Sequence, residues 1–554
     1  MPKSSKYQSL RVKSSKKTVL PDTAQESDRA LPIEADVILN ADAILQEVIE
    51  EALVDPLEDN PKHPKNQDTG TQEKDDHSED NISEDNTESN ASPAQSDAKD
   101  EDSKEKTAED SNPEDNSPEA SSETEIPDVL PGIDLTVEQW KILQELDAFV
   151  RGRRKLHLLT GYAGTGKTTL LQALIKQMRK RGDRRKIVLT AFSNKATKVL
   201  DSMANRWELT VDALTCCKLL GLKPDIDTNT GKQIFKPDPG SENIFDRYRL
   251  VIVDEASMIN EEMWNLLTEA VSDLHQRTQI LFVGDVAQLP PIGERESKTF
   301  SEIYDRSDLT QVVRYGGAIG VLAESIRNQL GNRYLPRFQT NINGDRTTGV
   351  VVAPSDQWEK LMVRAFLSDH YKKDSDYVRV LAYTNKRVNY LNHSIRTAIY
   401  GPATRRFVKG ERLIANAPCF VKENIVLQNS EECEVLEANE GKDGEWFVWF
   451  LRVLNDEDKV RHLTVLHELS LDKFDEQLKT YAEARRWREF WDLKTLFHNL
   501  SYAYCLTIHK SQGSTFKNVF VDIPNTLINY NIQERNQLLY VAVTRASDRL
   551  FLYQ

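Results

Sequence analysis

From Leu135 onward, short apolar runs alternate along the chain with stretches whose apolar residues recur every three or four positions. The runs predict four buried strands in the first half of this region, at 156–160, 186–191, 250–255 and 279–285. The longer spacing predicts helices that begin near Thr168 and Lys195. Because strands that alternate with helices form parallel sheets, this region predicts a doubly wound α/β lobe.

The same alternation resumes near Tyr377 and is then interrupted. Further strands are predicted at 378–384, 516–523 and 549–554, with a helix that runs through Asn389. Between them, residues 410–466 are rich in short β-type runs, and residues 468–497, which include Trp487 and Trp491, have helical spacing. We therefore expect a second α/β lobe that is interrupted by a small β-rich insert with attached helices.

The first 130 residues differ from the rest in composition. They carry 13 Lys+Arg and 34 Asp+Glu, a net charge of −21, whereas the other 424 residues carry 59 and 54, a net charge of +5. Residues 55–130 have almost no aromatic or β-branched side chains, so they cannot bury enough apolar surface to offset their ordering entropy. We expect this stretch to be disordered, and it either competes with nucleic acid for a basic groove or acts as a solvating linker.

Two shorter features lie within this N-terminal tail. Residues 37–54 have helical spacing, which indicates either a partner-binding helix or a transient helix without a fixed partner. Residues 1–21 hold six basic residues, several serines and no acid. That composition weakly resembles a transit peptide, although a solvated basic tail is the commoner explanation.

Cysteine content and hydropathy narrow the class of protein. The five cysteines show no CxxC spacing, so a disulfide framework or a structural zinc site is not expected, and a reducing compartment fits. No apolar run approaches the roughly 20 residues that span a bilayer, so no membrane partner is expected. The N-terminus has no apolar core of a secretory signal.

The segment from Gly161 to Thr168 fits the phosphate-loop pattern GxxxxGK[ST], and it follows a predicted strand and opens a predicted helix. Its glycines let backbone N–H groups surround phosphate oxygens, and the helix N-terminus adds a favourable dipole. Lys167 is expected to reach the β- and γ-phosphates of a nucleotide, and the Thr168 hydroxyl to ligate Mg²⁺. The alternative is a glycine-rich turn before a helix.

Two acids end the strand predicted at 250–255. We expect Asp254 to hold Mg²⁺ and Glu255 to orient or deprotonate an attacking water, which indicates ATP hydrolysis rather than nucleotide storage. The next predicted strand leads to Gln288, which is either a contact to the γ-phosphate or part of a turn that precedes two prolines.

Nine short stretches, in this order, resemble the motifs of superfamily 1B DNA helicases, the RecD-like and Dda-like branch. They are LTVEQ (135–139), GYAGTGKTT (161–169), LTAFSNKATKVL (189–200), DEAS (254–257), GDVAQLPP (284–291), LTQVVRY (309–315), LAYTNKRVNYLN (381–392), LTIHKSQGST (506–515) and LLYVAVTRA (538–546). The resemblance spans nearly all of the chain that is expected to be ordered.

The resemblance implies two RecA-like P-loop NTPase lobes with parallel sheets. The first lobe would comprise 131–345, with a hairpin insert at about 212–243 whose turn signal lies within 222–240. The second would comprise 346–409 and 498–554, interrupted by an SH3-like and helical insert at 410–497. In this family the hairpin acts as the pin that splits a duplex, and a plain decorative hairpin is the alternative.

The family's roles also imply an ATP site with Mg²⁺ as cofactor. Gln139 resembles the glutamine that recognises adenine, and Arg314 and Arg545 resemble two arginines that reach the γ-phosphate across the cleft, where a forked permanent charge suits the transferring phosphoryl group. The residues implied to bind nucleotide and Mg²⁺ are Gln139, Gly161, Gly164, Gly166, Lys167, Thr168, Thr169 and Asp254.

Residues after predicted strands in both lobes are implied to contact the backbone of single-stranded DNA. They are Thr190, Ser193, Asn194, Thr384, Asn385, Thr507, His509, Lys510, Ser511 and Gln512. Hydroxyls, amides and one lysine suit contact that is independent of base sequence. For each hydroxyl, the alternative is a helix cap or a strand-end turn.

The sequence therefore predicts an ATP-dependent DNA helicase that moves on single strands, and the resemblance alone implies the 5′→3′ direction. The expected partners are single-stranded DNA, duplex junctions and a protein bound by the tail. The expected location is a bacterial or phage-type cytoplasm, at the nucleoid. An RNA translocase and a nucleotide-switched clamp that does not unwind are the alternatives.

Overall fold

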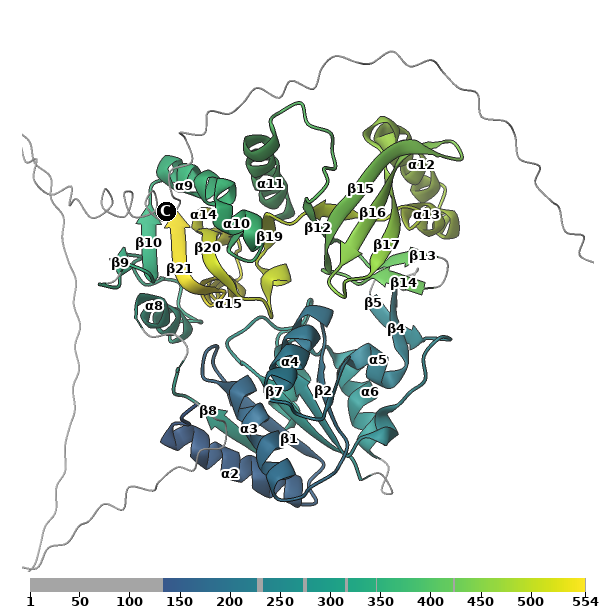
Figure 1. Cartoon of the computed structure of the whole chain (residues 1–554). Coiled ribbons are helices and arrows are strands. Elements are labelled where there is room, and N and C mark those ends of the chain that lie inside the picture. Colours follow the sequence, from purple (N-terminus) through teal and green to yellow (C-terminus); the bar gives the residue numbers. More distant parts are fainter. Residues whose placement is uncertain are drawn as a thin grey trace, which may run out of the picture.

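The computed structural model describes residues 133–226, 233–272, 277–313, 317–344, 346–421 and 424–553. Its first lobe is built on a sheet of six parallel strands in the order β3-β2-β6-β7-β1-β8 (Figure 1). In chain order the strands are β1 (Leu156–Gly161), β2 (Ile187–Ala191), β3 (Asp212–Thr215), β6 (Leu250–Asp254), β7 (Gln279–Gly284) and β8 (Arg306–Leu309).

Helices cover both faces of this sheet because neighbouring strand residues point to opposite sides. In β1, Leu159 packs in a cluster with Leu170 of α3, whereas Leu158 packs with Met263 of α6. The helices are α2 (Val137–Arg151), α3 (Lys167–Lys180), α4 (Asn194–Arg206), α5 (Cys216–Leu220), α6 (Glu261–Ser272) and α7 (Lys298–Glu302), with short 3₁₀ turns η2 (Phe245–Arg247) and η3 (Ala256–Met258).

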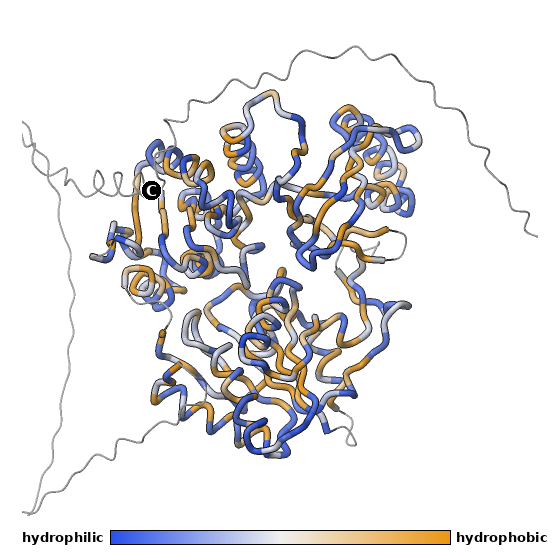
Figure 2. The backbone as a smooth tube through the Cα atoms, viewed as in Figure 1, coloured by the Kyte–Doolittle hydropathy of each residue, from blue (hydrophilic) through white to orange (hydrophobic). Residues whose placement is uncertain are grey.

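The second lobe contains another six-stranded sheet, in the order β19-β11-β20-β21-β10-β9, in which all neighbours except β9 and β10 are parallel. Its strands are β9 (Asn341–Ile342), β10 (Gly349–Ala353), β11 (Val378–Ala382), β19 (Cys505–Thr507), β20 (Phe516–Asp522) and β21 (Ala546–Tyr553). The hydrophobic segments of Figure 2 include the central strands of both lobes.

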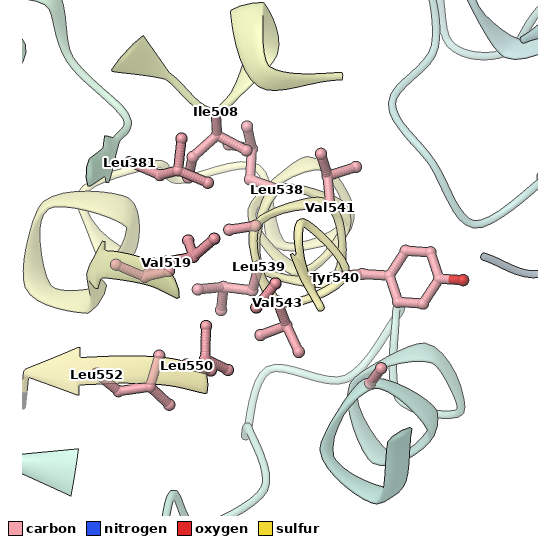
Figure 3. Packing of buried hydrophobic residues seen from close by; sticks show 14 of the residues in the cluster. Leu381, Ile508, Val519, Leu538, Leu539, Tyr540, Val541, Val543, Leu550 and Leu552 are labelled. Carbon is pink, nitrogen blue, oxygen red and sulfur yellow. The ribbon is translucent and has the colours of Figure 1, made fainter. Parts of the chain in front are cut away.

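The helices of this lobe complete its two apolar clusters. They are α8 (Ala318–Arg327), α9 (Ser355–Leu367), α10 (Asp369–Lys373), α11 (Asn385–Tyr400), α14 (Ile523–Leu527) and α15 (Ile532–Val543), with the 3₁₀ turn η5 (His509–Ser511). Helix α15 lies in the cluster of Figure 3, where its aliphatic residues pack against Val519 of β20 and Leu550 of β21.

The insert is an antiparallel five-stranded sheet in the order β17-β16-β15-β12-β18, with the small pair β13 and β14. Its elements are β12 (Arg412–Ala415), β13 (Cys419–Val421), β14 (Asn424–Leu427), β15 (Glu432–Asp443), β16 (Trp446–Asn455), β17 (Val460–Leu466), η4 (Glu468–Ser470), α12 (Leu471–Glu483), α13 (Trp487–Lys494) and β18 (Leu500–Tyr502). Aromatic packing of Trp446 with Phe474 and Phe497 joins the helices to the sheet.

The α/β class with two lobes and a β-rich insert is thus confirmed, although the second sheet has one antiparallel edge strand, β9. A β-hairpin formed by β4 (Leu222–Ile226) and β5 (Gln233–Pro237) is also present where the turn signal predicted it. The last strand begins at Ala546, three residues before the predicted start. Two predicted domain boundaries are wrong. Helix α8 and strand β9, predicted in the first lobe, pack in the second, and β18, predicted in the second lobe, pairs with β12 of the insert. The predictions for the acidic tail and for a helix at 37–54 lie outside the described residues.

All five cysteines are free thiols. None of the helices in the described part of the chain is long and apolar enough to cross a membrane.

A buried carboxylate joins both lobes and the insert. Glu432, the first residue of β15, lies 3.1 Å from the guanidinium of Arg379 in β11, 3.3 Å from Lys195 Nζ in α4 and 3.6 Å from the guanidinium of Arg412 in β12. Burial alone would raise the pKa of Glu432, but these three cations outweigh it and lower the pKa to about 2. One side chain therefore holds three parts of the molecule together.

We predict that Glu432→Gln lowers the free energy of unfolding by about 3 kcal/mol at pH 7, because it leaves the fully buried Arg379 without its buried counter-ion. The pKa of Glu432 is depressed in the folded state, so its contribution is present above pH 4.5 and declines as the pH falls toward 2. Urea unfolding at several pH values measures both effects.

The exposed ion pair of Glu437 with Arg452 provides the control. Glu437→Gln is expected to change the free energy of unfolding by less than about 1 kcal/mol. Equal losses in the two variants would show that Glu432 does not hold the parts together.

Candidate functional site

The phosphate loop connects the end of β1 to the start of α3. Gly164 and Gly166 have φ angles of 81° and 83°, and a Cβ atom on Gly166 would lie 2.6 Å from the Gln139 amide nitrogen, so glycine is required there. Lys167 Nζ donates to the carbonyl oxygens of Gly161 (2.6 Å) and Tyr162 (3.0 Å). The lysine therefore lies over the loop, where a phosphate would replace these acceptors.

Gln139 ties α2 to this loop. Its side chain is buried, its Oε1 accepts from Thr136 N in a capping box, and its Nε2 donates to the carbonyl oxygen of Thr165 at 2.9 Å. Whether it also contacts adenine stays a prediction, but it already fixes the back of the loop. Thr168 and Thr169 occupy the first turn of α3 and are half-buried.

Asp254 ends β6 and Glu255 follows it, both beside the phosphate loop. Burial, and then the neighbouring Asp254 carboxylate, raise the pKa of Glu255 to about 7, while Arg545 and Lys167 act in the opposite direction. Burial also raises the pKa of Asp254, whose Oδ1 accepts from Glu255 N at 2.9 Å. Glu255 has a φ of 53°, a strained conformation for a residue with a side chain. Such strain and such pKa shifts are typical of catalytic sites.

The donor set at this point fits Mg²⁺ that arrives with a nucleotide. Mg²⁺ prefers hard oxygen ligands and is usually held by one or two carboxylates together with substrate phosphates. Asp254 and the Thr168 hydroxyl provide such oxygens. Within the described ranges, no group of three or more His, Cys, Asp or Glu residues is placed to hold a metal ion.

The loop after β7 carries Gln288 and is held by side chains of the second lobe. Gln288 Oε1 accepts from Gln512 Nε2 at 3.1 Å, and the same nitrogen lies 3.2 Å from Ser257 Oγ. Gln537 Nε2 of α15 donates to the Gln288 carbonyl oxygen at 3.0 Å. A Cβ atom on Gly513, next to Gln512, would lie 3.9 Å from Glu255 Oε1. Both lobes therefore line the same cleft.

The structure describes one of the two arginines that are expected at the γ-phosphate. Arg314 lies outside the described residues. Arg545 is buried, and its guanidinium donates to the carbonyl oxygens of Val541 and Ser514, both at 3.0 Å, within its own lobe. Its charge still acts on Glu255, whose pKa it lowers.

The first-lobe residues expected to contact nucleic acid lie in the last part of β2 and directly after it. Thr190 is fully buried and its hydroxyl donates to Cys216 Sγ at 3.4 Å, while Ser193 Oγ caps α4 by accepting from Ala196 N at 3.2 Å. Asn194, the first residue of α4, lines a cavity of about 280 Å³ between α4 and the insert.

Lysines of α4 and α5 contact the insert at the edge of that cavity. Lys218 of α5 lies 3.6 Å from the Glu457 carboxylate, and Lys198 of α4 donates to the Asp456 carbonyl oxygen. Lys195 of α4 bonds to Glu432 as described. The basic side of α4 and α5 thus faces an acidic edge of the insert.

The second-lobe residues cluster at the ends of β11 and β19. Thr384 Oγ1 caps α11 and accepts from Asn525 Nδ2 at 3.0 Å, and Asn385 next to it is exposed. Thr507 Oγ1 accepts from Lys510 N at 3.3 Å, and Lys510 Nζ donates to Asn416 Oδ1 at 2.6 Å.

Side chains of the segment between β19 and β20 face either the predicted nucleic-acid edge or the cleft between the lobes. Burial lowers the pKa of His509 and of Lys510, whose side chains remain partly exposed. Ser511 is buried, with its hydroxyl donating to the Ile508 carbonyl oxygen, and Gln512 faces the cleft between the lobes. The segment therefore connects the predicted nucleic-acid edge to the ATP site.

Comparisons with known proteins agree with this geometry. The family model of an AAA domain matches residues 134–333, and that of the UvrD-like helicase C-terminal domain matches residues 502–553. The ATP-dependent DNA helicase dda of Enterobacteria phage T4 is 26% identical over 456 residues, which cover 76% of this chain and 99% of that protein. The RecBCD subunit RecD of Buchnera aphidicola subsp. Schizaphis graminum is 22% identical over 459 residues, covering 74% and 72%. This chain is thus similar to ATP-dependent DNA helicases, in an AAA domain at 134–333 and a UvrD-like helicase C-terminal domain at 502–553.

Two further similarities were found. The mimivirus protein R530 of Acanthamoeba polyphaga mimivirus is 25% identical over 490 residues, covering 75% of this chain and 98% of that one. Among solved structures, the Pif1 helicase from Bacteroides in complex with ADP-AlF3 and single-stranded DNA is 16% identical, with a TM-score of 0.43, and covers 76% and 92%.

Sequence reasoning did not single out Asp285, Gln537 or Tyr540. All three contribute hydrogen bonds to the cleft. Asp285 and Tyr540 lie inside recognised stretches, GDVAQLPP and LLYVAVTRA, so polar residues within those stretches were the available signal. Gln537 immediately precedes the second stretch and carried no signal of its own.

Proposed function

We propose that this chain is an ATP-dependent DNA helicase that moves along single-stranded DNA in the 5′→3′ direction. The observation that carries the proposal is the composition of the ATP cleft, in which Gln512 and Gln537 of the second lobe bond to the Gln288 loop of the first. Loss of the γ-phosphate can therefore alter contacts in both lobes at once. A motor that converts hydrolysis into relative motion of its lobes requires such a connection.

The residues of the cleft divide the chemical work as follows. Lys167 moves from the loop carbonyls to the β- and γ-phosphates, while Thr168 and Asp254 would hold the Mg²⁺ that neutralises charge on the nucleotide. Glu255 orients the attacking water and accepts its proton. Gln288 contacts the γ-phosphate, and Arg314 and Arg545 stabilise the charge that develops on it. Gln139 recognises the adenine.

The nucleic-acid path runs over the carboxyl ends of β2, β11 and β19. Backbone contacts from Asn194, Asn385 and Lys510 suit a strand of any sequence. Motion of the lobes then moves the contact made by Asn194 of the first lobe relative to those made by Asn385 and Lys510 of the second. The names of two relatives, an ATP-dependent DNA helicase and a RecBCD enzyme subunit, support activity on DNA. The proposed setting is duplex junctions in DNA replication, recombination or repair. A bacterial or phage-type cytoplasmic location at the nucleoid, and a protein partner for the tail, complete the proposal.

The decisive experiment compares strand separation on DNA duplexes that carry a 5′ or a 3′ single-stranded tail, with ATP and Mg²⁺. We predict unwinding of the 5′-tailed duplex only, and none by Lys167→Ala. A matching RNA substrate tests the translocase alternative. ATP hydrolysis stimulated by DNA, without unwinding of either duplex, would support a nucleotide-switched clamp instead.

A further inference from the structure

The hydroxyl of Tyr540 crosses from the second lobe to the phosphate loop. Tyr540 belongs to α15 and extends away from the aliphatic side chains around it, with its oxygen outermost (Figure 3). That oxygen donates to Asp285 Oδ2 at 2.8 Å and accepts from Ala163 N at 2.9 Å. Asp285 follows β7, and Ala163 is the third residue of the phosphate loop, so one hydroxyl contacts two parts of the ATP site.

Further hydrogen bonds hold the Asp285 side chain in place. It is fully buried, its Oδ2 also accepts from Ala163 N at 2.7 Å, and its Oδ1 accepts from Ala287 N at 2.9 Å. Tyr540, Asp285 and Ala163 thus form a closed triangle of hydrogen bonds. Burial, and then the Asp285 carboxylate, raise the pKa of Tyr540, so its hydroxyl stays protonated and remains a donor.

The contact lies on a face of α15 that is already turned toward the first lobe. Gln537, three residues before Tyr540 and therefore on the same side of the helix, bonds to the Gln288 carbonyl oxygen. Arg545 follows the end of the same helix, where its charge acts on Glu255. The position of α15 relative to the phosphate loop therefore also fixes where Arg545 lies.

We propose that Tyr540 is a positioning residue for ATP hydrolysis. Its hydroxyl, which bonds to Asp285, fixes the position of α15 and Arg545 relative to the phosphate loop. This inference rests on the proposed function, because it assigns a role in the ATPase cycle of the same cleft. Tyr540 does not touch the reacting atoms, so its loss is expected to slow the chemical step rather than to weaken nucleotide binding.

The test compares Tyr540→Phe with Tyr504→Phe. Tyr504 is buried in the same lobe, and its hydroxyl donates to Glu411 Oε1 at 2.9 Å, away from the phosphate loop. We expect Tyr540→Phe to lower kcat for DNA-stimulated ATP hydrolysis about tenfold, with KM for ATP within about twofold, as the loss of one hydrogen bond to a charged group predicts. Tyr504→Phe is expected to leave both constants unchanged. Equal kcat values in the two variants would overturn the inference.

A second measurement does not depend on hydrolysis. In the nucleotide-free protein, Tyr540→Phe is expected to speed hydrogen exchange at 161–166 and 285–289 by several-fold, because Ala163 N and Asp285 each lose a partner. Tyr504→Phe serves as the reference, and unchanged exchange in Tyr540→Phe also overturns the inference. If the wild type shows no DNA-stimulated hydrolysis, the proposed function fails, and exchange alone decides on Tyr540.

Discussion

Replacing Glu255 by Gln is expected to lower kcat for ATP hydrolysis by about 10²- to 10⁴-fold, the range ascribed to general base catalysis, while ATP binding is retained. Gln has nearly the same shape as Glu but accepts no proton from water. The variant keeps the charges of Lys167 and Asp254, which are proposed to hold the nucleotide and its metal ion. Single-turnover hydrolysis and equilibrium binding of a fluorescent ATP analogue measure the two properties separately.

The pH dependence of the wild type gives an independent test of the same role. A base must be deprotonated to act, and the pKa of Glu255 is raised to about 7 in the metal-free cleft. The rate is therefore expected to rise with pH through the pKa of Glu255, which bound Mg²⁺ displaces downward because a cation favours the carboxylate. Glu261→Gln, at the exposed start of α6, is the control and is expected to keep wild-type activity. More than one tenth of wild-type activity in Glu255→Gln would exclude Glu255 as the base.

Lys167→Ala is expected to remove ATP-dependent unwinding altogether and to lower kcat/KM for ATP by about 10²- to 10³-fold or more. The variant loses the positive charge that neutralises the phosphates. It also loses the hydrogen bonds that Lys167 Nζ donates to the carbonyl oxygens of Gly161 and Tyr162 in the nucleotide-free protein. Steady-state hydrolysis over a range of ATP concentrations measures the loss.

Lys176 offers a matched control on the same helix. It lies over the ring of Trp207, 5.5 Å from its centre, and away from the phosphate loop. Lys176→Ala is expected to leave kcat/KM within about twofold of the wild type, since a surface cation–π contact is weak. Comparable losses in the two variants would mean that the charge of α3 as a whole, and not Lys167, supports nucleotide use.

The sequence predicts the local parts of the site well because their residues are close in the chain. The phosphate loop is one turn between β1 and α3, and a pattern of glycines, a lysine and a threonine is enough to predict it. The acids at the end of β6 are predicted in the same way, from an apolar run that ends in two carboxylates. Their raised pKa values follow from burial, which becomes known only with the fold.

The contacts between lobes could not be predicted in this way. Gln512 and Gln288 are 224 positions apart, and Tyr540 and Asp285 are 255 positions apart. Which polar side chain meets which depends on how two sheets face each other, and no local pattern records that. The same limit applies to hydroxyls such as Ser193 and Thr384, which cap helices in the structure and can contact phosphate only through what those caps leave free.

The ion cluster around Glu432 has a consequence for any attempt to trim this protein to a minimal motor. The insert looks like a separable appendage, and joining residue 409 to residue 503 would remove its sheet and helices along with Glu432. Arg379 would stay buried in β11 of the remaining sheet, and among the described residues its other ion-pair partner is Asp376, whose carboxylate is about half exposed. A shortened version therefore needs an apolar residue such as Met at 379 from the outset. Natural relatives that lack the insert are expected to carry such a residue at this position as well.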